Sequence, residues 1–311
     1  MTQNGRGTQL FSMMDAIFGA IFSGPIKAIP SAPPLVETST QWQRPSISST
    51  TSLPLKLMSW NLLAPPYNRR NSGRESEESW RARAAEQMLY AAASDADIIG
   101  LQEFWLETAH VQLWTEWAKE HHYTMHLVPR TDGKRDGCAM LVRMPSSACR
   151  FSAYTFNDWG SRIVQACDLT LEGIGPLTLL QTHLTFPHAS AHDPVMRRQQ
   201  ARKLSELVRE RSEPVCVFGD LNGDVDDPAV SELTTTGGLR SGAPATGWVS
   251  HIAHTGDLMA CDLVLTRGGC HVRDFRVAGT QEALIKGEMA SDHRPIHAVL
   301  VLGEGESAAT E

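Results

Sequence analysis

The sequence predicts a layered fold of the α+β class. From Leu55 onward, short apolar runs rich in β-branched residues alternate with segments of helical periodicity. This alternation is typical of sheets covered by helices and not of a helical bundle. The chain has 311 residues, of which 41% are hydrophobic and 20% charged. A chain of this size can bury roughly three quarters of the surface that it exposes when unfolded, so one large domain needs no metal or disulfide scaffold.

The apolar runs and the helical periodicity place the individual elements. Strands are predicted at Leu55–Asn61, Asp97–Gln102, Ala139–Val142, Ile163–Leu169, Leu177–Thr182, Val215–Gly219, Asp262–Thr266, Val272–Val277 and His297–Leu302. Helices are predicted at Glu77–Ala93, Glu107–His121, Pro194–Arg211 and Pro228–Thr236. The last helix has a strong start signal, because Asp227 suits the N-cap position and Pro228 the first helical position.

Both ends of the chain differ from this domain, which we expect to span residues 55–302. Residues 1–54 are rich in Ser, Thr and Pro and contain only two acids, Asp15 and Glu37. Such a segment does not form a core, so we expect a disordered tail, with an organelle-targeting segment as the alternative. Residues 303–311 are expected to be a frayed tail. The longest apolar stretch, residues 10–22, is too short for a transmembrane helix.

Charge and cysteine content narrow the class of protein. The net charge of −7 argues against a non-specific coat on duplex DNA, although a local basic cleft remains compatible with a nucleic-acid enzyme. The six cysteines are scattered without a CxxC pair. They are therefore interpreted as buried, reduced thiols of an intracellular, cytoplasmic protein, which we expect to be a monomer.

Polar residues end or begin several of the predicted strands. They are Asn61, Glu103, His183, Asp220, Asn222, Asp262, Asp292 and His293. Each alone has a structural explanation: Gly-Asp-Leu-Asn-Gly is an ordinary turn, and a lone histidine after a strand is more often a satisfied surface or core residue. So many acids, amides and imidazoles at strand ends indicate a shared site.

These residue types suit phosphate chemistry. Magnesium prefers oxygen ligands, and Glu103 and Asp292 could hold it. Asn61 and Asn222 offer amides that orient water or phosphate without adding negative charge. Histidine exchanges protons near neutral pH, and Asp262 is a natural partner to fix the tautomer of His293.

Six ordered blocks of sequence resemble the endonuclease/exonuclease/phosphatase superfamily of DNase-I-like, metal-dependent phosphoesterases. The blocks are SWNLLAPPY, DIIGLQEFW, LLQTHLTFPH, VCVFGDLNGD, CDLVL and SDHRPI. The resemblance covers Leu55 to Leu302. It implies a four-layer α/β/β/α sandwich with the site at one end of two packed sheets.

The resemblance also implies a role for each residue. Asn61, Glu103 and Asp292 belong to the metal site, which takes Mg²⁺ or Mn²⁺, with Glu103 as the direct ligand. Asp220 and Asn222 position and activate the attacking water, and His183 contacts the scissile phosphate. Asp262 orients His293, which acts as acid/base or stabilises the transition state. Arg162 and His251 are expected to contact the substrate.

Local sequence is most similar to deadenylase-like members and to plant and algal proteins described as calcium-binding. The one stretch resembling a calcium loop, Asp220–Asp226, has valine where the tight turn needs glycine, so we predict no calcium-sensing hand. The predicted function is Mg²⁺-dependent hydrolysis of phosphodiesters, with RNA or a nucleotide as substrate. The alternatives are a lipid or inositol phosphate hydrolase similar to sphingomyelinases, and a catalytically dead binding scaffold.

Overall fold

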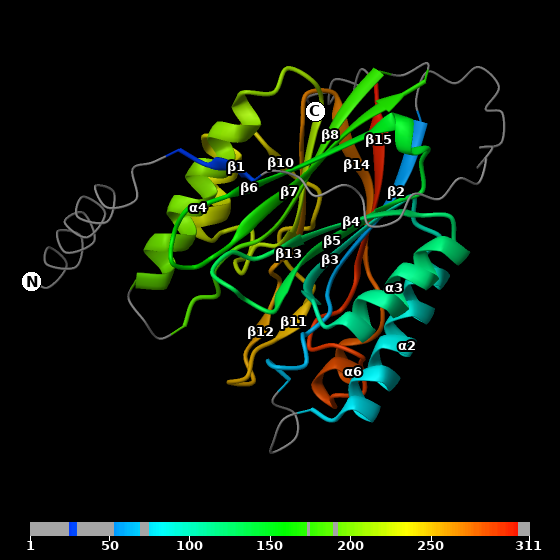
Figure 1. Cartoon of the computed structure of the whole chain (residues 1–311). Coiled ribbons are helices and arrows are strands. Elements are labelled where there is room, and N and C mark those ends of the chain that lie inside the picture. The colour runs from blue at the N-terminus through cyan, green and yellow to red at the C-terminus, as the bar shows by residue number, and fades with distance from the viewer. Residues whose placement is uncertain (1–24, 30–52, 69–74, 173–174, 189–191, 304–311) are drawn as a thin grey trace, which may run out of the picture.

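Two β-sheets packed face to face form the centre of the molecule, and helices cover both outer faces (Figure 1). The computed structural model describes residues 25–29, 53–68, 75–172, 175–188 and 192–303. The arrangement of helix, sheet, sheet and helix layers confirms the predicted α+β sandwich.

The first sheet has seven strands, of which only β8 and β9 run parallel to each other. Its order is β1 (Lys27–Ile29), β6 (Cys149–Thr155), β7 (Ile163–Leu171), β8 (Gly175–His183), β9 (Val215–Asp220), β13 (Asp262–Arg267) and β10 (Arg240–Ser241). Helices α4 (His192–Arg209) and α5 (Pro228–Thr235) cover its outer face.

The second sheet has six strands, with β2 and β3 as its parallel pair. Its order is β14 (Cys270–Val277), β15 (Ile296–Leu302), β2 (Leu53–Asn61), β3 (Ile98–Trp105), β5 (Asp136–Val142) and β4 (Thr124–Pro129). Helices α2 (Glu77–Ser94) and α3 (Thr108–Glu120) cover its outer face. Smaller elements complete the described chain: the 3₁₀ turn η1 (Ser146–Ala148), the hairpin of β11 (His251–Ile252) and β12 (Leu258–Met259), and α6 (Gln281–Ile285).

The main core lies between the two sheets. Leu57 and Ile98 from one sheet pack in the same cluster as Cys167 and Phe218 from the other, and all four are at most 1% exposed. Burying one large apolar side chain contributes about 1.5–3 kcal/mol. The central strands are buried on both faces, which explains why runs such as Ile98–Leu101 are continuously apolar.

The structure also has strands that the sequence did not predict. In β6, most side chains are only partly buried and include Arg and Ser, so the run lacks an apolar signal. Strand β4 carries His126 and Thr124 as buried polar residues. The expected tail contributes β1, whose three residues pair with β6. That edge strand is largely exposed, so its residues show no alternation of apolar and polar side chains that would predict a strand. Leu53 and Pro54 of the expected tail belong to β2, and residues 1–24, 30–52 and 304–311 of the expected tails lie outside the described residues.

Other local expectations agree with the structure. Helix α5 begins at Pro228, and the Asp227 side chain accepts a hydrogen bond from the Ala229 N–H at 2.8 Å, as its N-cap role requires. All six cysteines are free thiols, and only Cys149 is not fully buried. Within the described ranges, we find no helix with both the length and the apolar character to span a bilayer.

Candidate active site

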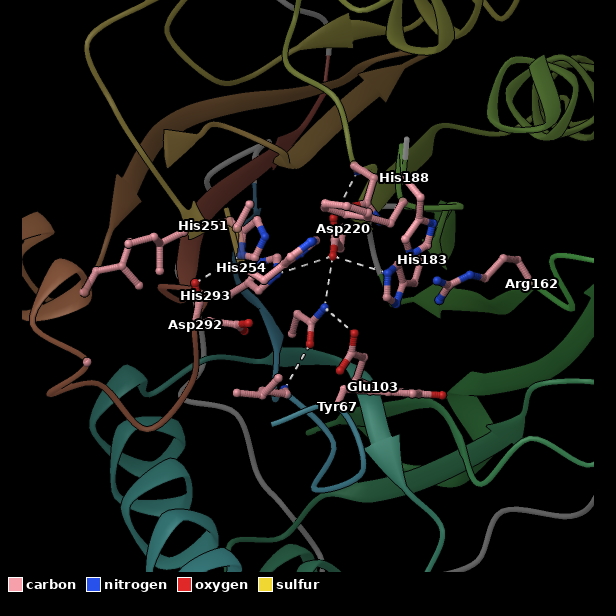
Figure 2. Close-up of a pocket in the computed structure, with 18 of the residues that line it drawn as sticks. Tyr67, Glu103, Arg162, His183, His188, Asp220, His251, His254, Asp292 and His293 are labelled. Atoms are coloured by element: carbon pink, nitrogen blue, oxygen red, sulfur yellow. Dashed lines mark hydrogen bonds and ion pairs between the residues drawn. The ribbon is translucent and has the colours of Figure 1, made fainter. Parts of the chain in front are cut away.

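The polar strand ends converge at one end of the sandwich. Asn61 ends β2 and His183 ends β8, so the two parallel pairs of strands bring residues from both sheets to one place. They line a cavity of about 640 Å³ (Figure 2). Nine of the ten residues predicted from the sequence line it: Asn61, Glu103, Arg162, His183, Asp220, Asn222, His251, Asp292 and His293. The tenth, Asp262, is fully buried and hydrogen-bonds to His293.

Asp220 contacts side chains from both sheets. Its Oδ2 accepts a hydrogen bond from Asn61 Nδ2 at 2.9 Å and lies 3.4 Å from His183 Nε2 and 3.6 Å from His293 Nε2. Figure 2 shows Asp220 between the two histidines. Burial is the largest influence on this carboxyl and raises its pKa to about 6 against the opposing effect of His293. A carboxyl with a pKa near neutrality is suited to accept a proton.

The backbone around Asp220 fits only certain residues. Gly219 has a φ of +135°, and a Cβ there would lie 2.0 Å from the carbonyl oxygen of Thr182 on the neighbouring strand. Glycine is therefore required for β9 to pair closely with β8. Asn222, with a φ of 52°, turns the chain back so that its N–H donates to Asp220 Oδ1 at 3.0 Å. The Nδ2 of Asn222 donates to the Leu184 carbonyl at 2.8 Å, which leaves its Oδ1 to accept from water.

Glu103 is placed by an irregularity in β3. The pairing of β3 with β5 shifts register between Leu101 and Phe104, and Glu103 has a φ of 48°. Bulges of this kind re-aim side chains beside active sites. Glu103 accepts hydrogen bonds from Asn61 Nδ2 at 3.4 Å and from the Ala64 N–H at 3.0 Å. Burial, and then the charge of Asp292, raises its pKa to about 7.

His293 is held in a fixed orientation. Its Nδ1 donates to Asp262 Oδ2 at 2.8 Å, and its backbone carbonyl accepts from Trp60 Nε1 at 2.8 Å. The ring stacks on His251, with centroids 3.9 Å apart. Burial alone would lower the pKa of His293, but the carboxylates of Asp262 and Asp220 outweigh it and raise the pKa to about 10. The imidazole is thus protonated at neutral pH and can donate from Nε2.

Positive charge lies on the opposite wall. Arg162 is 9% exposed, and its Nε and Nη1 have no hydrogen-bond partner among the described residues. Burial, followed by the charge of Arg130, lowers the pKa of Arg162. Burial and the charges of both arginines also lower the pKa of His183 well below its usual value, so this ring is neutral. The unpaired guanidinium beside a neutral imidazole is suited to hold an anion.

Several residues that line the cavity were not predicted from the sequence. Arg130 forms a salt bridge of 3.2 Å with Asp136, whose Oδ1 also accepts from the Tyr67 hydroxyl at 2.8 Å. Lys134 lies in the loop between β4 and β5, which carries no recognisable motif. An aromatic cluster forms another wall, where Phe186 lies 5.0 Å from His188 and 6.1 Å from His254 between ring centroids. The sequence signals for that wall were the Thr-Phe-Pro-His block, which contains Phe186 and His188, and the predicted substrate contact His251, whose ring lies 6.3 Å from Phe186.

The acidic residues of the cavity fit a divalent cation. Glu103 and Asp292 are carboxylates in one cavity, and the charge of Asp292 disfavours ionisation of Glu103. A bound cation would relieve this repulsion. The carboxylate oxygens of Glu103 and Asp292 match the preference of magnesium, and Asn61 offers an ion the second lone pair of its Oδ1, which already accepts from the Leu63 N–H at 3.0 Å.

One known protein family matches most of the chain in sequence. A sequence profile of the Endonuclease/Exonuclease/phosphatase family matches residues 58–293. A search of curated proteins found no match.

Solved structures with the same fold were found at low sequence identity. One is ANGEL2, described as a 2′,3′-cyclic phosphatase, in complex with adenosine-2′,3′-vanadate: 15% identity, a TM-score of 0.65, and coverage of 81% of this chain and 96% of that one. Another is the human Nocturnin catalytic domain with bound sulfate, with 17% identity, a TM-score of 0.59 and coverage of 80% and 95%. A third is humanized D. rerio TDP2, with 18% identity, a TM-score of 0.59 and coverage of 81% and 99%. At these identities the likeness establishes the fold.

Proposed function

The chain belongs to the Endonuclease/Exonuclease/phosphatase family, and we propose that it is a Mg²⁺-dependent phosphodiesterase that acts on RNA or nucleotides. The observation that carries this proposal is the group of side chains around Asp220, which accepts a hydrogen bond from Asn61 and lies 3.4 Å from His183 and 3.6 Å from His293, beside the carboxylates of Glu103 and Asp292. Proton acceptor, proton donor and metal-binding acids share one cavity.

Asp220 and Asn222 would activate the attacking water. The Oδ2 of Asp220 takes a proton from the water as the water oxygen attacks phosphorus, and the pKa of about 6 suits this step at neutral pH. Asn222 Oδ1 accepts the other hydrogen of the water and fixes its direction of attack. One base of this kind supplies about 10²–10⁴ in rate, so the larger share must come from electrostatic stabilisation.

The remaining side chains would hold the phosphate. His293 gives its Nε2 proton to the leaving oxygen and becomes neutral, while Asp262 accepts from Nδ1 and keeps the ring oriented; the alternative role of His293 is to keep that proton and stabilise the transition state by donating it as a hydrogen bond to a phosphate oxygen. His183 and Arg162, which line the other wall of the cavity, would contact the phosphate from that side. Glu103, Asp292 and Asn61 would hold Mg²⁺, or Mn²⁺ as the alternative ion. When bound, that ion supplies positive charge against the charge that develops on the phosphate oxygens.

The aromatic wall favours a nucleotide substrate. Phe186 lies within 6.3 Å of the His188, His251 and His254 rings, measured between centroids. Flat rings beside a phosphate site offer stacking surfaces for a base, worth about 1–3 kcal/mol per base. The adenosine vanadate bound to ANGEL2 supports the same substrate class.

Hydrolysis assays test the proposal in two stages. Purified protein should hydrolyse bis-p-nitrophenyl phosphate when Mg²⁺ is added and stop when EDTA removes it; activity that survives chelation would reject the metal-dependent mechanism. A panel of oligo(A), structured RNA, sphingomyelin and inositol phosphates then tests the substrate class. If only the lipid or the inositol phosphates are cleaved, the substrate belongs to that class and is not RNA. Tight binding without cleavage of any member would indicate a binding scaffold.

A further inference from the structure

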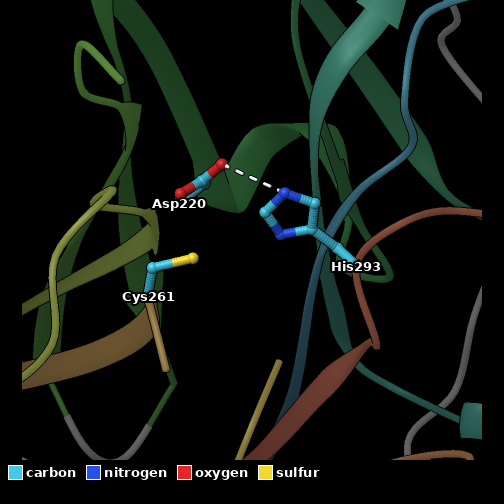
Figure 3. Close-up of side chains that lie close together, drawn as sticks. All are labelled: Asp220, Cys261 and His293. Atoms are coloured by element: carbon cyan, nitrogen blue, oxygen red, sulfur yellow. Dashed lines mark ion pairs between the residues drawn. The ribbon is translucent and has the colours of Figure 1, made fainter. Parts of the chain in front are cut away.

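A buried thiol lies directly beside the two residues that would transfer protons. Cys261 precedes Asp262, which is paired with Asp220 across strands β13 and β9. One ligand atom each from Asp220, Cys261 and His293 lies within 4.8 Å of the other two. Figure 3 shows the Cys261 sulfur directed toward the space beside the other two side chains. The hydrolytic mechanism has no use for a thiol there.

Carboxylate, thiolate and imidazole together are the ligands of a soft or borderline metal ion. Zinc binds these three groups, usually with four ligands in a tetrahedron, whereas magnesium takes oxygen ligands and does not favour thiolate. The 3.6 Å between Asp220 Oδ2 and His293 Nε2 is close to the separation of two ligands on one tetrahedral zinc ion. The sulfur must move inward for Zn²⁺ to bind, since it lies up to 4.8 Å from the other ligand atoms and the Zn–S bond is about 2.3 Å.

The environment of His293 already resembles that of a zinc ligand. Its Nδ1 donates to Asp262 Oδ2 at 2.8 Å, which leaves Nε2 directed at Asp220. Histidine ligands of metals commonly donate their second ring N–H to a carboxylate in this way, which fixes the ring and strengthens the ligand. Asp220 and His293 line the cavity, so an ion can reach the group by the path that the substrate uses.

We propose that Asp220, Cys261 and His293 form an inhibitory zinc site. As the Zn–S bond forms, the Cys261 thiol loses its proton to solvent, and His293 releases its Nε2 proton when it carries one. No oxidation state changes. A zinc ion held there occupies both the proton acceptor and the proton donor, so hydrolysis stops while Glu103 stays outside the zinc site. Binding does not depend on the proposed function; the inhibitory consequence rests on it.

A second group of residues offers zinc a competing position. His251, Asp292 and His293 also bring ligand atoms within 4.8 Å of one another, but without sulfur. The two positions share His293 and therefore exclude each other. Thiolate coordination distinguishes them.

Cobalt spectroscopy and zinc titration of the full chain test the proposal. Wild-type protein loaded with Co²⁺ in place of Zn²⁺ should show the near-ultraviolet charge-transfer absorption of a cobalt–thiolate bond. Cys261→Ala should lose that absorption and bind Zn²⁺ about 100-fold more weakly, because losing even an outer-shell partner costs about 10–100-fold. The matched control is Cys270→Ala, since Cys270 is another buried thiol, in the core between the sheets. That variant should match wild type in both measurements.

Two results would overturn the proposal. Absence of the thiolate absorption in wild-type protein rejects it outright, and this measurement needs no variant to fold. Unchanged zinc affinity in Cys261→Ala would assign zinc to the group without sulfur. Activity gives an independent readout, because Zn²⁺ added to the Mg²⁺ assay should inhibit wild type and Cys270→Ala more strongly than Cys261→Ala. If wild type hydrolyses nothing, the proposed function fails while the binding measurements still decide the zinc site.

Discussion

Replacing Asp262 by asparagine removes a charge from the site and keeps its shape. Asparagine can still accept the 2.8 Å hydrogen bond from His293 Nδ1, so the ring orientation is retained. What changes is the pKa of His293. Burial lowers that pKa, and the carboxylates of Asp262 and Asp220 raise it to about 10. Without the first carboxylate we expect the pKa to fall by about 1–3 units, the usual effect of one close opposite charge.

The same shift has a consequence for stability. A histidine whose folded pKa lies above its unfolded value of 6.5 stabilises the fold fully below pH 6.5 and loses that contribution as pH rises through about 10. Between about pH 7 and pH 10 the wild-type free energy of unfolding should fall by on the order of 3 kcal/mol from this group. Asp262→Asn should lose about 1.4 kcal/mol of this dependence for each unit by which the pKa of His293 falls.

Two measurements check the Asp262→Asn variant. The pH profile of kcat in Mg²⁺ should show its alkaline limb shifted to lower pH, and urea unfolding at several pH values should show the flatter stability profile. Asp274→Asn is the control, because Asp274 is a half-exposed acid paired with Arg276. An alkaline limb that coincides with that of wild type would refute the reasoning that Asp262 keeps His293 protonated.

Three further variants test other parts of the site and fold. Mg²⁺ should bind wild type about tenfold more weakly at pH 6 than at pH 8, because a proton competes at Glu103, where burial and then Asp292 raise the pKa to about 7. Calorimetry should show weaker, pH-independent binding in Glu103→Gln, and an unchanged pH dependence would exclude Glu103 as ligand. Gly219→Ala places a Cβ 2.0 Å from the Thr182 carbonyl oxygen and should cost at least about 2 kcal/mol of stability in urea unfolding; a loss below about 0.5 kcal/mol would contradict that contact. Burial lowers the pKa of His110 to about 4, so stability should be full above pH 6.5 and fall by about 2 kcal/mol between pH 7.5 and pH 5. His110→Phe should flatten this slope, and an equally steep slope in the variant would show that other groups cause it.

Local patterning along the chain predicted alternating strands and helices with polar residues at several strand ends, and the resemblance to a known family supplied the four-layer arrangement. Buried strands such as β9 are continuous apolar runs, and helix α5 begins at the Asp227-Pro228 signal. The polar residues that end β2 and β8 line one cavity, because both strands end at the same end of the two packed sheets. These features depend on local patterning, which a sequence displays.

Other features depend on long-range geometry that no local pattern displays. Strand β6 is half-exposed, so its residues do not form an apolar run. The positive φ of Glu103 results from the shifted pairing of β3 with β5. In the sequence, Cys261 has the pattern of an ordinary core residue. Only the pairing of β13 with β9 brings its thiol close to Asp220. Arg130 reaches the cavity through its salt bridge to Asp136.

Turnover by Asp220→Asn tests the central claim most directly, because this carboxylate contacts residues from both sheets and would accept the proton of the attacking water. Measured on bis-p-nitrophenyl phosphate with saturating Mg²⁺, kcat should fall by about 10²–10⁴. The Mg²⁺ affinity, measured by calorimetry on the same preparation, should stay within a few fold of wild type. Wild-type turnover in this variant would contradict the assignment of Asp220 as the base, and with it the hydrolytic site proposed here.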